Sequence, residues 1–99
     1  MNINDFMETK IPEIKNIISN LRDEFSSHQF IQKFSKQFEP EYIDMLMEYR
    51  GFGAFRAVHS QIATYLSKNM DKLDIEKIEP KKESINIFGD TDIIQWWKK

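Results

Sequence analysis

The sequence contains no cysteine, few glycines and prolines, and no long apolar run. Without cysteine, the chain can form neither a disulfide framework nor a thiolate metal site. The first ten residues carry two acids and lack the apolar core of a signal peptide. No stretch approaches the roughly 20 apolar residues that a membrane-spanning helix needs. We therefore expect a cytoplasmic protein without a signal peptide or a membrane segment.

The composition that is present is typical of one folded domain. Among its 99 residues, 40% are hydrophobic, and the eight phenylalanines and two tryptophans argue against disorder. A chain of this length buries roughly two-thirds of the surface that it exposes when unfolded, so a true core is expected. The net charge of -2 means that any binding of nucleic acid must come from a local patch and not from bulk charge.

Residues 4–25 are predicted to form an N-terminal helix. Their apolar residues repeat at spacings of four and three, which is typical of a stripe that packs on another helix. The stripe consists of Met7, Ile11, Ile14, Ile18, Leu21 and Phe25. Pro12 predicts either a kink or a second helix that has the proline in its first turn. The stripe packs on its own domain or forms a two-stranded homodimer seam, in which Ile14 and Ile18 contact the partner.

The next two helices have clear local signals. Ser26 and Gln29 form a capping box, so a helix should begin at Ser27 and end before Pro40. Its predicted inner residues are Phe30, Ile31, Phe34 and Phe38, while His28 should face solvent. Pro40 then opens a helix whose early acids have a structural explanation in the helix dipole. Its predicted inner residues are Tyr42, Ile43, Leu46, Met47 and Tyr49.

The predicted helix over residues 54–69 carries the main functional hypothesis. One face is apolar and should be buried: Phe55, Val58, Ile62, Tyr65 and Leu66. The other face carries short or hydrogen-bonding residues: Arg56, His59, Ser60, Ala63, Thr64 and Ser67. No Asp or Glu occurs from Tyr49 to Met70, so this segment is locally positive. Such a surface suits a polyanion, although a helix can also lack acids without any functional reason.

The last part of the chain changes to a strand pattern. Residues 73–79 and 84–88 are predicted strands, with Ile85 and Ile87 on one side and a polar turn at residues 80–83. This hairpin would carry Lys81 and Lys82 at its tip. Residues 92–97 form a further short strand or a turn of helix that closes over the core. In a strand, Trp96 and Trp97 face opposite ways, which leaves one of them available to a partner.

The turn Gly51-Phe52-Gly53 joins two helices into the unit of a helix-turn-helix, and its glycines supply the positive φ that such a turn needs. With the hairpin that follows, the element order over residues 26–97 resembles the winged helix-turn-helix superfamily. The resemblance implies an α+β fold, mainly α with a small C-terminal β-hairpin. A winged-helix-like domain would occupy residues 26–99 after an extra helix in residues 1–25, with a single compact domain overall. The ending of the chain is also similar to that of small bacterial proteins, which implies no activity.

The resemblance also implies a role for the helix over residues 54–69, namely that of a recognition helix in the major groove of double-stranded DNA. The residues at bases or phosphates would then be Arg56, His59, Ser60 and Thr64, with Lys81 and Lys82 on the flanking backbone. Against this, a binder that makes about 6–10 phosphate contacts needs about that many cations, and this face offers only about five or six.

Two other function classes stay open. The chain could be a non-enzymatic protein-interaction module, such as an inhibitor of a nucleic-acid enzyme, with the N-terminal helix or the tryptophan edge as its surface. The candidate partner-binding residues are Ile14, Ile18, Trp96 and Trp97. An enzyme ranks last, because the adjacent His59 and Ser60 point about 100° apart on a helix and no phosphate-loop or zinc motif occurs. We expect no catalytic residue, cofactor or metal.

Overall fold

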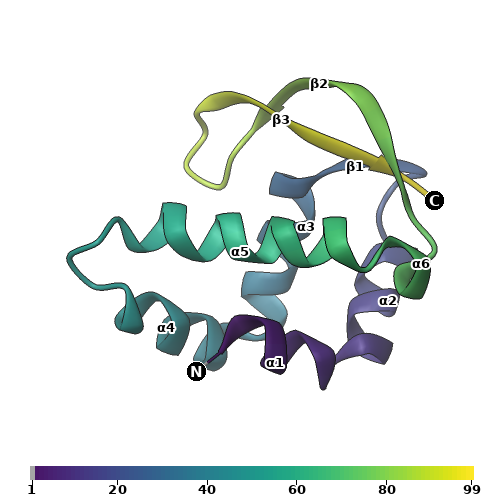
Figure 1. Ribbon diagram of the computed structural model, residues 1–99. Coiled ribbons are helices and arrows are strands. Elements are labelled where there is room, and N and C mark those ends of the chain that lie inside the picture. Colours follow the sequence, from purple (N-terminus) through teal and green to yellow (C-terminus); the bar gives the residue numbers. More distant parts are fainter. Residues whose placement is uncertain (1) are drawn as a thin grey trace.

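The computed structural model describes residues 2–99, which form six helices and one three-stranded antiparallel sheet (Figure 1). The helices are α1 (Ile3–Glu8), α2 (Ile11–Ser19), α3 (Ser27–Gln37), α4 (Glu39–Glu48), α5 (Ala54–Lys68) and α6 (Met70–Leu73). The strands are β1 (Glu24–Ser26), β2 (Glu76–Ile85) and β3 (Thr91–Lys98), in the order β1-β3-β2. The mixed α+β class is confirmed. The radius of gyration of 12.8 Å is that of a compact body.

Helix α5 lies in the middle of the molecule. The sheet arches over one side of it, and α1 and α4 lie along the opposite side (Figure 1). The core-facing residues of α5 are buried: Val58, Ile62, Tyr65 and Leu66. The predicted helix and its inner face are thus confirmed, with the exception of Phe55. That side chain is exposed because it does not pack into the core. Its ring instead contacts the ring of Phe88 in the hairpin.

The N-terminal segment forms two helices and not one. Pro12 lies in the first turn of α2, which confirms the second-helix alternative, but the predicted helix end at Phe25 is wrong. The helix ends at Ser19, where the side chains of Ser19 and Asn20 both donate hydrogen bonds to the carbonyl of Asn16. Phe25 then lies in β1, opposite Trp97 of β3.

The apolar stripe of this segment belongs to the core of the chain. Ile14 and Ile18 are 0% and 4% exposed and pack in one cluster with Met7 and Phe25. A homodimer seam would need these isoleucines at the surface. Intrachain packing therefore accounts for both, and their assignment as partner-binding residues is corrected.

The capping box at the start of α3 is confirmed. Ser26 Oγ accepts from the amide of Gln29, and Gln29 Oε1 accepts from the amide of Ser26, both at 3.1 Å. Its predicted inner residues are all buried: Phe30, Ile31, Phe34 and Phe38.

Helix α4 is rotated relative to the prediction. Ile43 and Met47 were expected inside but are exposed, because the neighbouring helices cover the other side, where Tyr42 and Met45 are buried. The two glycines that follow have φ of 83° and 68°, as the turn between α4 and α5 requires.

The hairpin differs from the prediction in its register. Strand β2 continues through residues 80–83, so Lys81 and Lys82 lie within the strand and their placement at the tip is wrong. The turn falls at residues 86–90, where Asn86 Oδ1 accepts from the amides of Phe88 and Asp90 at 2.9 and 3.0 Å. In consequence Ser84, and not Ile85, faces inward, and its hydroxyl meets Ser26 Oγ at 2.7 Å.

A buried hydrogen-bonded pair joins the sheet to α3. Trp97 Nε1 donates to Ser27 Oγ at 3.0 Å, and that hydroxyl donates to the carbonyl of Gln95 at 3.1 Å. Trp96 lies on the other face of β3, half-buried, with Lys82 Nζ 4.8 Å from its ring centroid. The prediction that the two tryptophans face opposite ways is confirmed.

Candidate functional site

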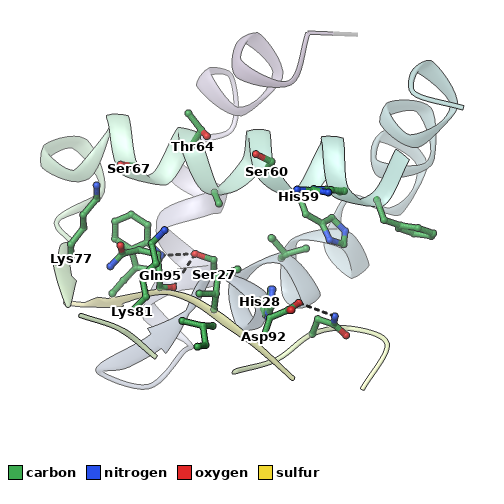
Figure 2. Close-up of a pocket in the computed structure, with 18 of the residues that line it drawn as sticks. Ser27, His28, His59, Ser60, Thr64, Ser67, Lys77, Lys81, Asp92 and Gln95 are labelled. Carbon is green, nitrogen blue, oxygen red and sulfur yellow. Dashed lines mark hydrogen bonds between the residues drawn. The ribbon is translucent and has the colours of Figure 1, made fainter. Parts of the chain in front are cut away.

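A groove of about 790 Å³ runs between α5 and the β2–β3 hairpin. This volume lies within the range of about 300–1,000 Å³ that is usual for ligand sites. Five of the six predicted nucleic-acid-binding residues line it: Arg56, His59, Ser60, Thr64 and Lys81. Figure 2 shows Ser67, Thr64, Ser60 and His59 succeeding one another along α5, across from Lys77, Lys81 and Gln95. The structure therefore brings the predicted face of α5 together with the sheet.

The outer rim of the groove is polar and exposed. Arg56, Ser60 and Thr64 follow one another at spacings of four, so they form one line along α5. All three are exposed to solvent, since Val58 and Ile62 hold the opposite face in the core. These three residues are therefore the solvent-exposed part of the predicted recognition surface on α5.

The sheet contributes two cations to the groove, of which the sequence pattern identified only one. Lys77 and Lys81 of β2 both line it. Lys82, the next residue, points to the other face of the strand, where its ammonium lies over Trp96 and 3.5 Å from Glu24. Lys77 was missed because a local pattern does not show which face of its strand meets α5. The irregularity between Ile78 and Lys82 leaves Lys77 and Lys81 on the same side of β2.

His59 is not a simple surface residue. Its Nε2 lies 2.6 Å from the hydroxyl of Tyr42, and the two rings stack with centroids 5.9 Å apart. Burial lowers the pKa of His59 to about 4, and the nearby His28 acts in the same direction. At neutral pH His59 therefore contributes a neutral ring to the groove and no charge.

His28 was expected to face solvent, and this is wrong. Its side chain lines the groove and the residue is only 8% exposed, because the sheet covers the first turn of α3. Burial lowers the pKa of His28, which Asp92 and a backbone hydrogen bond with Ser84 partly oppose. Among the described residues, Nδ1 of this ring has no hydrogen-bond partner.

Acid is expected to destabilise the protein in part through His59. The folded protein keeps this ring neutral down to a pKa of about 4, while the unfolded chain takes up the proton near 6.5. Between these values the unfolded state binds more protons, so this contribution to stability is complete above pH 6.5 and declines as the pH falls. In His59→Phe, which keeps an aromatic ring, the urea midpoint should change less between pH 7 and pH 5. Equal changes in both proteins would place the pH dependence elsewhere.

The predicted partner-binding residues mostly lie inside. Trp97 is buried like Ile14 and Ile18, and only the half-buried Trp96 reaches the surface. The exposed apolar residues that the sequence pattern did not identify include Ile43, Met47 and Phe52 on α4 and in the glycine turn, and Ile85 and Ile93 in the hairpin.

Comparisons with known proteins add no assignment, since no family model, no curated protein and no solved structure matches the chain. Within residues 2–99, no group of three or more His, Cys, Asp or Glu side chains is placed to hold a metal ion. None of the helices in this part of the chain is both long enough and apolar enough to cross a membrane.

Proposed function

We propose that this chain is a non-enzymatic, winged-helix-like cytoplasmic protein that binds double-stranded DNA through α5 and β2. The element order supports the class: α3 to α5 are followed by the short helix α6 and a hairpin, and β1 completes a sheet of order β1-β3-β2. The two short helices α1 and α2 precede this unit. No catalytic step is assigned, because Tyr42 engages the only histidine of α5 and the adjacent Ser60 points away from it.

One observation carries the proposal. The exposed, acid-free line of α5 and two lysines of β2 border the same groove. With 15 residues, α5 is about 22 Å long and fits a major groove about 12 Å wide. In this arrangement Ser60 and Thr64 meet the base edges, Arg56 meets a phosphate, and one phosphate strand passes between α5 and Lys77 and Lys81.

The charge on this surface sets the strength of binding. The candidates for phosphate contacts are Arg56, Lys68, Lys77 and Lys81, while His59 is neutral and Lys82 is outside the interface. About four contacts imply a slope near -3.6 in a plot of log binding constant against log salt. Affinity should then fall by about 10²-fold between 50 and 200 mM salt. The proposed binding is therefore weak at physiological ionic strength and best measured at low salt.

The charge reversal Arg56→Glu should lower duplex affinity by about tenfold or more at moderate salt. An attraction is replaced by a repulsion within the screening distance of about 10 Å. Stability should change by less than about 0.5 kcal/mol, because the side chain is exposed. Fluorescence anisotropy with a random duplex at low salt measures this effect.

The matched control for this experiment is Lys33→Glu. Lys33 borders a separate small groove between α2 and α3, so its reversal changes the net charge equally but lies outside the proposed interface. Equal losses in both variants would show a bulk-charge effect. If Arg56→Glu binds the duplex as tightly as the wild type does, the recognition-helix assignment is refuted.

The two neighbouring lysines of β2 should differ in their effect on salt dependence. Lys81→Ala should make the salt slope shallower by about one unit and weaken binding to all duplex sequences alike. Lys82→Ala should leave the slope unchanged, since this side chain packs over Trp96 on the other face. Salt titrations of both variants by anisotropy test this, and the reverse result would place the other face of the sheet on the DNA.

A second candidate function is a protein-interaction module, which includes an inhibitor of a nucleic-acid enzyme. The observation that favours it is the group of exposed apolar side chains on α4 and in the glycine turn, Ile43, Met47 and Phe52. Absence of duplex binding by the wild type at low salt would favour this module, with α4 in place of the N-terminal stripe as its surface.

A further inference from the structure

The inner end of the groove, next to the hairpin tip, has chemistry that the DNA proposal does not use. Phe88 in the turn and Phe55 on α5 meet edge to face, with ring centroids 4.7 Å apart, and His59 lies 5.9 Å from Phe55. All three side chains line the groove. Phe55 and Phe88 remain 44% and 56% exposed. Exposed rings in a groove are a surface on which a planar ligand can stack.

Beside these rings lies a hydrogen-bond acceptor without a donor. His28 is 8% exposed, and its side chain lines the groove. Its Nδ1 has no hydrogen-bond partner among the described residues, and in the neutral tautomer that carries the proton on Nε2 this atom is an acceptor. Buried acceptors are rarely left unpaired, and a ligand that donates here would satisfy this one.

Asp92 supplies a second acceptor in the same groove. Its charge acts on His28, and its Oδ2 accepts a long hydrogen bond of 3.4 Å from Asn86 Nδ2. A carboxylate has capacity for further donors. Arg56 and Lys81 also line the groove, so a cationic ligand such as an arginine side chain is disfavoured. The matching ligand is an uncharged planar ring that carries a hydrogen-bond donor.

We propose that this end of the groove binds a nucleobase that carries an amino group, stacked on the exposed ring of Phe88 and packed beside Phe55, with the amino group donating to Asp92 and to His28 Nδ1. Nδ1 is shielded from solvent, so this binding requires a displacement of the hairpin tip, which contacts α5 through the ring of Phe88. In a duplex both faces of each base are covered by the neighbouring bases, so neither face is free to stack on these rings. The ligand is therefore a free nucleoside or an unpaired base of a single strand, and this inference does not depend on duplex binding.

Cytidine and uridine are matched probes, because they differ at C4 by an amino group against a carbonyl. Titration of the full chain, followed by amide chemical shifts in NMR spectra, should show saturable shifts at the hairpin tip and the start of α3 with cytidine. Uridine should bind about tenfold more weakly or not at all. Equal binding of both nucleosides, or binding of neither at millimolar concentration, would overturn the proposal. So would displacement of cytidine by N-acetylarginine amide, which would identify a guanidinium site.

The variant Asp92→Asn should lower cytidine affinity about tenfold, to the level of uridine, because the amide group provides a weaker acceptor. The residue is exposed, so the fold should be kept, and an unchanged preference for cytidine would remove Asp92 from the site.

Ten-nucleotide oligomers of dC and dT distinguish the two sources of the base. Tighter binding of oligo-dC than of cytidine identifies a single strand, and equal affinity identifies the free nucleoside. If the protein binds duplex DNA but does not prefer cytidine to uridine, the nucleobase site is refuted and the proposed duplex binding stands.

Discussion

Replacing Ile14 with Asp is expected to unfold the protein, not to release folded monomers from a dimer. The side chain is 0% exposed and lies in the common core cluster. A carboxylate at this position loses its hydration without gaining a partner, at a cost of several kcal/mol. That cost is comparable with the total stability of a small domain, about 5–15 kcal/mol. Far-UV circular dichroism and sedimentation velocity measure the two outcomes.

Two variants sharpen this experiment. Ile43→Asp places the same charge at an exposed position of α4 and should stay folded. Ile14→Val removes one methylene and should cost about 0.5–1.5 kcal/mol, which confirms the burial without loss of the fold. A folded monomeric Ile14→Asp protein, together with a dimeric wild type, would restore the homodimer seam and overturn the core assignment.

The two neighbouring tryptophans should differ strongly when each is replaced by alanine. Trp97→Ala should cost about 3–5 kcal/mol, because it empties a large buried volume between β3 and the start of α3. Trp96→Ala should cost only about 1–2 kcal/mol, since this ring is half-buried and loses its contact with Lys82 and an exposed hydrogen bond from Nε1 to the carbonyl of Glu83. Urea unfolding followed by circular dichroism gives both values. Equal costs would mean that the two faces of β3 are assigned wrongly.

A double-mutant cycle isolates the hydrogen bond of Trp97. Ser27→Ala alone removes the acceptor of Nε1 and should cost about 1–3 kcal/mol. In the Trp97→Phe background the same change should cost less, because no indole donor is left unpaired. Additive costs would show that the bond does not contribute and that packing alone holds the tryptophan.

The groove contains two kinds of chemistry in adjoining parts. Its rim has exposed cations and hydroxyls on α5 and β2, which suit phosphate oxygens. Its inner end has aromatic rings and two acceptors, which suit the donor edge of a base. The proposed duplex contact and the proposed nucleobase site therefore use different residues. Arg56→Glu and Asp92→Asn should affect them separately.

Local features of the fold could be predicted from the sequence. The capping box at Ser26 and the glycine turn before α5 depend on contacts within a few residues, and both have the predicted geometry. The period of α5 also predicted its buried side, because a long periodic segment has only one way to bury its apolar stripe. The polar line of Arg56, Ser60 and Thr64 follows from the same period.

The register of the hairpin could not be predicted from such local patterns. The lysine pair was assigned to the tip because Pro80 and the charges resemble a turn, while the turn chemistry actually lies at Asn86 and Gly89. A shift of a turn reverses which residues face inward, and the buried contact of Ser84 with Ser26 fixes the observed choice.

The sequence by itself determined the helix caps, the glycine turn and the two faces of α5, since each depends on neighbours along the chain. Only the tertiary structure decided that Phe25 leaves its predicted helix to pair with Trp97, 72 residues away. It also decided that His28 is buried and that Lys77, Asp92 and Phe88 join α5 around one groove. These outcomes depend on which distant element covers a side chain. Hydrophobic burial is not directional, so a local pattern does not specify that partner.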